Sequence, residues 1–164
     1  MKPLQEMVLL SEIVLQAKIA RLAAKRLNEI DHVEVWCSIQ SILVASGNVS
    51  KILWPSRKES RSRGMELRKM LQIEDNNILS SRKFRNLFEH YDERIEEWFS
   101  KQSSGVYTDL AMNPSQNSFM SQTVNRGYNS INNTLVFRGE ILDLNEVLNS
   151  LNEILKKCKS FVLT

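Results

Sequence analysis

The stretch KFRNLFEHYDERIEEWF, residues 83–99, decides how the sequence is interpreted, because its apolar residues recur at the spacing of one helical face. At about 100° per residue, these side chains lie within about 40° of the direction of Phe84. They are Phe84, Phe88, Tyr91, Ile95 and Trp98. With a serine just before it as a cap, the pattern predicts one continuous helix over residues 82–101 that buries this face in a core.

The opposite side of the same predicted helix is polar and holds one of only two histidines in the chain. Its centre consists of Arg82, Asn86, Glu89 and Glu93. Arg85 and His90 flank this centre, about 140° apart around the helix axis. One copy of the helix therefore directs these two side chains away from a common point, and a site that uses both favours a second copy.

The composition is that of a single globular domain, residues 1–164. With 42% hydrophobic and 25% charged residues, the chain is long enough to bury a core. The formal net charge of +3 is too small for a protein that coats nucleic acid over its whole surface. A basic surface for nucleic acid must therefore be local.

The two cysteines and the N-terminal segment bear on the cellular compartment. Cys37 and Cys158 lie in apolar-periodic segments and belong to no metal or redox motif, which predicts buried thiols, a reducing compartment and no structural zinc. Charged residues interrupt the apolar N-terminal segment before it reaches membrane-spanning length. We therefore expect a cytoplasmic protein with no signal peptide, no membrane contact, no metal and no cofactor.

Further helices are predicted before the central stretch. A first helix over residues 3–30 has apolar residues around much of its circumference, so it is central in a bundle or packs on a second chain as well. A second helix over residues 31–53 must end before Pro55, since proline disfavours helix in the residue that precedes it. A polar loop is predicted over residues 54–64, and a short helix over residues 65–71.

The character of the sequence changes between residues 103 and 143, where Ser, Asn, Gln and Gly are frequent. Within this segment, TLVFRGEILDL places two β-type runs on either side of Arg138 and Gly139, which predicts a hairpin. Asp143 is a predicted cap for a C-terminal helix over residues 144–162. The prediction is thus a mainly α fold, an up-and-down bundle of four to five helices with a small β-hairpin insertion, at about 103–143, before the last helix.

The polar face of residues 82–101 resembles the motif of the HEPN family. Its all-helical domains carry an Arg, usually followed by a polar residue, and then a His after a spacer of four to six residues. The match here is Arg85, Asn86 and His90 in RNLFEH. In HEPN ribonucleases two such helices face each other across a dimer and make one composite, metal-independent site that cleaves RNA. The resemblance implies a homodimer, an RNA substrate and, as for many relatives that are toxins or defence effectors, an antitoxin-like protein partner.

Two comparisons within the sequence define this resemblance more closely. Arg26 and His32 also have a suitable spacing, but Arg26 is followed by an apolar residue and the pair spans a predicted helix end. Only Arg85 has a polar follower and lies well inside a predicted helix. Some HEPN proteins carry a Tyr two residues after the His, where this chain has Asp92, so a role that depends on that tyrosine is not implied.

The residue types suit cleavage of RNA by its own 2′-hydroxyl group. That reaction needs a base that titrates near neutral pH and a cation that neutralises the phosphorane, and His90 and Arg85 supply them. Asn86 is a candidate for orienting either the phosphate or His90, and Glu89 is a candidate for pairing with Arg85, one turn away. The alternative interpretation is that this face is only a solvated helix surface.

Apart from this helix face, a basic segment lies between Lys51 and Lys69, with seven basic and two acidic residues. It either holds RNA phosphates or is a solvated loop. The candidate substrate-binding residues are Arg82, Glu89, Arg57, Arg61 and Arg63. Two other functions stay open: a catalytically silent HEPN-like dimeric binding or scaffold protein, and RNA binding that is independent of sequence and involves no cleavage.

Overall fold

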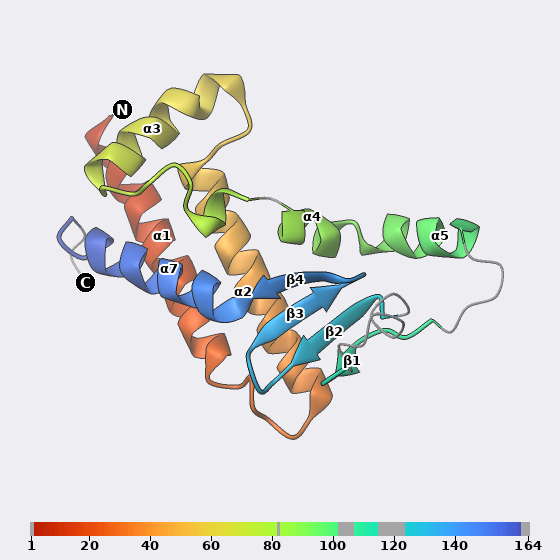
Figure 1. Cartoon of the computed structure of the whole chain (residues 1–164). Helices are drawn as coiled ribbons and strands as arrows, with labels where there is room; N and C mark the ends of the chain where they lie inside the picture. The colour runs from red at the N-terminus through yellow and green to blue at the C-terminus, as the bar shows by residue number, and fades with distance from the viewer. Residues whose placement is uncertain (1, 82, 102–106, 115–123, 162–164) are drawn as a thin grey trace. The chain divides into compact units, whose positions relative to one another are not determined.

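Figure 1 shows a computed structural model of the chain, which describes residues 2–81, 83–101, 107–114 and 124–161. The chain divides into two compact units. Residues 1–82 and 146–164 form the first, which we call the helical unit, and residues 83–145 form the second, the sheet unit. The protein is mainly helical with a small sheet before the last helix, as the sequence predicts.

The helical unit is built on an antiparallel pair of long helices, followed by shorter elements (Figure 1). Its elements are α1 (Pro3–Ala24), α2 (His32–Leu53), the 3₁₀ turn η1 (Lys58–Ser60), α3 (Arg61–Met70), the 3₁₀ turn η2 (Ile78–Ser80) and most of α7 (Leu144–Cys158). Asp31 caps α2, because its Oδ1 accepts a hydrogen bond from the Val33 amide at 2.7 Å. Its apolar side chains that face the core are buried, among them Trp36, Ile39, Leu43, Val49 and Leu53.

Three helix boundaries differ from the prediction. α1 ends at Ala24 rather than near residue 30, because the chain turns at residues 25–28. α3 begins at Arg61, inside the predicted loop, where Arg63 donates to the carbonyls of Lys51 and Ile52 at the end of α2. α7 begins directly after the capping residue Asp143, as expected, but ends at Cys158, and residues 159–161 form a turn.

The prediction of two buried thiols is half wrong. Cys158 is buried, and burial raises the pKa of its thiol to about 11. Cys37 is exposed, because it lies on the side of α2 that points away from the buried Trp36 and Ile39. Among the described residues, every helix is too short or too polar to span a bilayer.

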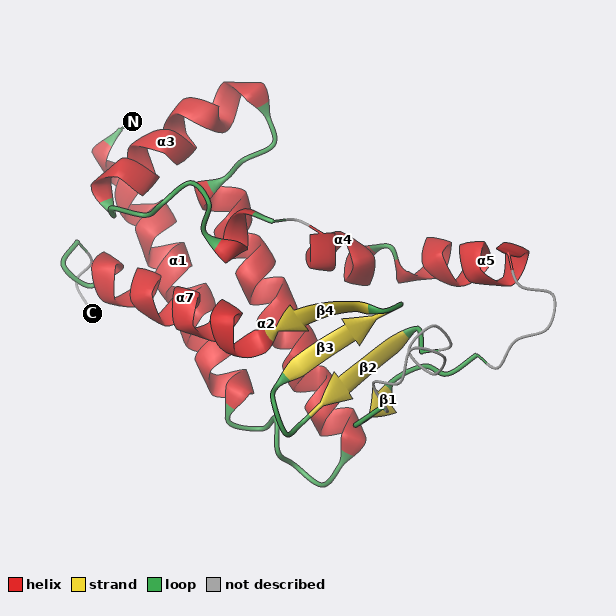
Figure 2. Ribbon diagram, in the orientation of Figure 1, coloured by secondary structure: helices red, strands yellow, loops and turns green. Residues whose placement is uncertain are grey.

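In its described residues, the sheet unit contains the helices α4 and α5 and a small sheet (Figure 2). Its elements are α4 (Lys83–Glu89), α5 (Tyr91–Lys101), β1 (Ala111–Met112), β2 (Arg126–Asn129), β3 (Thr134–Phe137) and β4 (Glu140–Asp143). In the described residues the strand order is β1-β2-β3-β4, with β1 parallel to β2 and the other pairs antiparallel. The predicted hairpin is confirmed as β3 and β4, and its turn has positive φ at Arg138 (48°) and Gly139 (83°).

The continuous helix predicted over residues 82–101 is interrupted at His90. The helical hydrogen bonds on either side of it persist, from the His90 amide to the Asn86 carbonyl (3.1 Å) and from the Arg94 amide to the His90 carbonyl (3.2 Å). Of the predicted apolar face, Trp98 is buried, but Tyr91 is exposed. The predicted apolar face is therefore carried by two short helices instead of one.

Candidate functional site

His90 occupies the junction between α4 and α5 and is half exposed. Its Nδ1 lies 3.3 Å from Oε1 of Glu93, one turn further along the chain. A histidine that donates from Nδ1 to a carboxylate is held in the tautomer whose Nε2 can accept a proton. Within the described part of the chain, Nε2 has no hydrogen-bond partner. In that tautomer the free Nε2 of His90 would be an acceptor open to solvent.

The other predicted catalytic residues belong to α4. Asn86 is exposed and lies four residues before His90, so the two are placed on the same side of the chain at this point. Glu89 is also exposed. The backbone of Arg85 is part of α4, but its side chain lies outside the described residues, as does the whole of Arg82. The structure thus places Asn86 one helical turn before His90 and the Glu93 carboxylate beside the His90 ring.

The sheet supports the junction of α4 and α5 through aromatic contacts. The rings of Phe88 and Phe137 lie 6.1 Å apart, which attaches α4 to β3. The guanidinium of Arg126, on β2, lies 6.0 Å from the ring centroid of Phe88 and 5.3 Å from that of Tyr91. These two rings stand on either side of His90 in the sequence. The β insertion therefore holds the segment that carries His90.

Arg126 is itself held by Asp109 in a pair of parallel hydrogen bonds, Nε to Oδ1 at 2.9 Å and Nη2 to Oδ2 at 2.5 Å. Burial alone would raise the pKa of Asp109, but the hydrogen bonds and charge of Arg126 lower it below its usual value. The same hydrogen bonds with Asp109 raise the pKa of Arg126. Both groups are therefore charged at neutral pH.

A second arginine connects α5 to the sheet. Arg138 donates from Nε to Oδ1 of the buried Asn125 at 3.0 Å and from Nη1 to Oε2 of Glu97 at 3.4 Å, and it also binds the Arg94 carbonyl. Hydrogen bonds from Lys101 and Arg94 lower the pKa of Glu97 to about 2. Nothing in the sequence pattern pointed to this network, because its members come from separate short segments.

The predicted phosphate-binding residues of the basic segment lie in the helical unit. Arg57 and Arg61 are exposed. Arg63 is half buried and binds the last carbonyls of α2, which is a structural use of its charge at a helix C-terminus. The ring of Trp54 is covered by the guanidinium of Arg68 at 5.6 Å. Of the three arginines predicted to bind phosphate in this segment, Arg57 and Arg61 are thus the two that are exposed.

The remaining comparisons concern metals and relatives. In the part of the chain that the structure describes, no three His, Cys, Asp or Glu side chains gather as metal ligands would. Comparisons with protein-family models, with curated proteins and with solved structures find no match to this chain. The function must therefore be inferred from the residues themselves.

Proposed function

We propose that this protein is a metal-independent endoribonuclease of HEPN type, with His90 as its general base and an active site shared between two copies of the chain. The observation that carries the proposal is the contact of His90 Nδ1 with the Glu93 carboxylate at an exposed helix junction. Such a contact can fix the tautomer of the ring, which a general base needs.

The reaction that this arrangement suits is internal transesterification of RNA. His90 Nε2 takes the proton of a ribose 2′-hydroxyl, and that oxygen attacks the neighbouring phosphorus. The bond to the 5′-oxygen of the next nucleotide breaks, which leaves a 2′,3′-cyclic phosphate and a 5′-hydroxyl. Arg85 neutralises the charge of the phosphorane, and Asn86 binds a phosphate oxygen. In the dimer, the His90 of the second copy, in its protonated form, supplies the proton to the leaving oxygen.

The first test compares variants of the two histidines on mixed RNAs in EDTA. Wild-type protein should cleave RNA, and both His90→Ala and Arg85→Ala should lower the rate by about 100-fold or more. His32→Ala is the matched control, because His32 is an exposed histidine at the start of α2 and should leave the rate unchanged. A rate that falls equally in both histidine variants, or that vanishes in EDTA, would contradict the proposal.

A binding protein without chemistry is the second candidate, and the exposed apolar side chains of α1 favour it, namely Leu4, Val8, Leu15 and Leu22. For that function, wild-type protein leaves all RNAs intact, and His90→Ala has no effect on association. Charge reversal at Glu89 or Glu93 would instead weaken binding of the partner, measured by titration calorimetry.

A further inference from the structure

A recess between α1 and the C-terminal half of α7 (Figure 1) gathers three cations. Arg21 comes from the last turn of α1, Lys156 from the last turn of α7, and Lys159 from the turn that follows α7. All three side chains are exposed. The recess has a volume of about 390 Å³, near the lower end of the range for small-molecule sites. Its size therefore suits a small ligand, and its charge favours an anion.

The three cations of this recess do not hold the fold together. Within the described part of the chain, their side chains form no hydrogen bond and no ion pair. A helix C-terminus favours cations by itself, but other cations of this unit bind carbonyls directly. Arg63 does so at the end of α2, and Lys157 Nζ lies 2.7 Å from the Gln72 oxygen. Cations that share a recess without a counter-ion repel one another, and a bound anion removes that repulsion.

The rest of the lining suits hydroxyl groups better than an apolar ring. Asn149 and Asn152 present amides and Glu153 presents a carboxylate, and together these groups donate to and accept from hydroxyls. Their three- and four-residue steps place them on one face of α7. Among the described lining residues, Leu155 is the one apolar side chain and none is aromatic. A nucleobase would therefore find no ring on which to stack.

The net charge of the recess matches a phosphate monoester. Its three cations and one carboxylate leave two positive charges in excess. A phosphate monoester carries about 1.5 to 2 negative charges at neutral pH, and the planar fork of an arginine binds two of its oxygens at once. The phosphodiesters of an RNA strand carry one charge each, and the Glu153 carboxylate would repel such a continuous backbone. A small phosphorylated ligand is therefore favoured over RNA.

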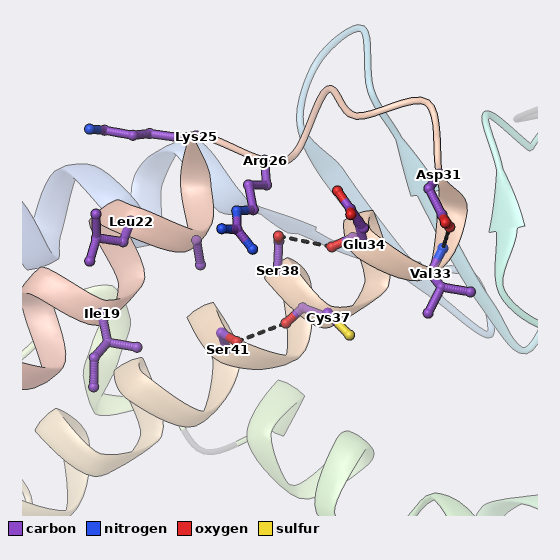
Figure 3. A pocket seen from close by; sticks show the side chains of 11 residues that line it. Ile19, Leu22, Lys25, Arg26, Asp31, Val33, Glu34, Cys37, Ser38 and Ser41 are labelled. Carbon is purple, nitrogen blue, oxygen red and sulfur yellow. Dashed lines mark hydrogen bonds between the residues drawn. The ribbon is translucent and has the colours of Figure 1, made fainter.

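A larger recess of the helical unit, between α1 and α2, has a different charge. Its volume is about 590 Å³, and Figure 3 shows the residues that line it. Lys25 and Arg26 lie at this recess together with Asp31 and Glu34, so its cations and carboxylates balance. Its charge therefore selects neither anions nor cations, and its arginine provides a control for that of the α1–α7 recess.

We propose that the α1–α7 recess binds a small phosphorylated sugar, whose phosphate contacts Arg21, Lys156 and Lys159. Asn152 and Glu153 bind the hydroxyl groups of the sugar. The recess belongs to the helical unit and includes no residue of the His90 site. Binding is measured without RNA, so the inference holds or fails separately from the proposed ribonuclease activity.

Titration calorimetry of the full chain with ribose 5-phosphate tests the recess. Wild-type protein should bind this probe at low salt, and added salt should weaken the binding. Arg21→Gln and Lys156→Gln should each weaken it by about 5-fold or more. Arg26→Gln, at an exposed arginine that lines the other recess, is the matched control and should bind as wild type does. Because all three side chains are exposed, far-UV circular dichroism should stay unchanged.

Inorganic phosphate and ribose, titrated separately, test the two halves of the ligand. Ribose 5-phosphate should bind more tightly than either. Glu153→Ala removes both a hydroxyl acceptor and a charge that repels anions, so it should lower the affinity for ribose 5-phosphate relative to that for inorganic phosphate. An unchanged ratio of these affinities would overturn the inference, as would a wild-type protein that does not bind ribose 5-phosphate. Equal weakening in Arg21→Gln and Arg26→Gln, or a short RNA that binds this recess while ribose 5-phosphate does not, would also overturn it.

Discussion

Arg126 and Asp109 form a two-fold hydrogen-bonded ion pair within the sheet unit, and the same guanidinium lies against the rings of Phe88 and Tyr91. The pair is 89% and 79% shielded from solvent, since the side chains are only 11% and 21% exposed. It connects β2 to the helix junction that presents His90. The orientation of the candidate base therefore depends on a contact far from it in sequence.

Replacing Asp109 should destabilise the sheet unit. Asp109→Asn leaves the Arg126 charge without its counter-ion in a largely buried place, and we expect a loss of about 2–3 kcal/mol, less than for a fully buried pair. Hydrogen exchange of the amides in β2 and β3 measures the change. Asp92→Asn, at an exposed carboxylate of α5, is the control. Unchanged protection in Asp109→Asn would show that the ion pair contributes no net stability.

The same pair should make this stability depend on pH. Because the pKa of Asp109 is lower in the folded chain than its unfolded value of about 3.9, its contribution is complete above that value. The contribution disappears as pH falls through the lower, folded pKa. The difference in protection between wild type and Asp109→Asn should therefore be constant from pH 7 to about 5 and shrink below about pH 4. A difference that grows on acidification would contradict this assignment.

Gly64 is expected to be essential for the packing of α3. A Cβ at this position would lie 2.5 Å from Cδ of Pro55 and 2.7 Å from the carbonyl oxygen of Leu53. Gly64→Ala should lower the free energy of unfolding by about 1–3 kcal/mol, because the clash outweighs the gain of roughly 1 kcal/mol in helix propensity. Urea denaturation measures this loss of stability. Ser62→Ala, at an exposed residue of the same helix, is the control. If the two variants were equally stable, the close approach of Gly64 to Pro55 and Leu53 would not limit the packing of α3.

The carboxylate of Glu93 should affect catalysis without affecting the fold. Glu93→Gln keeps a hydrogen-bond acceptor near His90 Nδ1 but removes the negative charge beside the ring. Since Glu93 is largely exposed, we expect only about a 3- to 10-fold fall in kcat, with KM unchanged. Single-turnover cleavage of a labelled RNA measures it, and Glu96→Gln, at an exposed residue of the same helix, should behave as wild type. A Glu93→Gln rate equal to that of the control would remove Glu93 from the mechanism.

The sequence predicts those parts of the fold in which local signals agree. Asp31 and Asp143 cap helices as expected, and Arg138 and Gly139 form the expected hairpin turn. The break at His90 was not predictable from periodicity, because a helical pattern continues through it. Contacts that involve β1 and β2 were also missed, since these strands are only two and four residues long and carry no clear alternation.

The candidate site was predicted in part. His90 and Asn86 lie together as the helical spacing requires. Glu93 as the partner of His90 was not singled out, because the choice between neighbouring carboxylates depends on side-chain rotamers that the sequence does not define. The use of Arg63 to bind the end of α2 was missed for a similar reason: charge composition does not distinguish a phosphate ligand from a helix cap.

The most direct test of the central claim is cleavage in EDTA of one RNA made in two forms, unmodified and with every ribose 2′-O-methylated. Wild-type protein should cut the unmodified RNA and leave 2′,3′-cyclic phosphate ends, whereas the methylated RNA should stay intact, because the attacking hydroxyl is absent. His90→Ala should cut neither. Cleavage of the methylated RNA, or unmodified RNA cut as fast by His90→Ala as by wild type, would contradict the assignment of His90 as the base of an RNA-cleaving site.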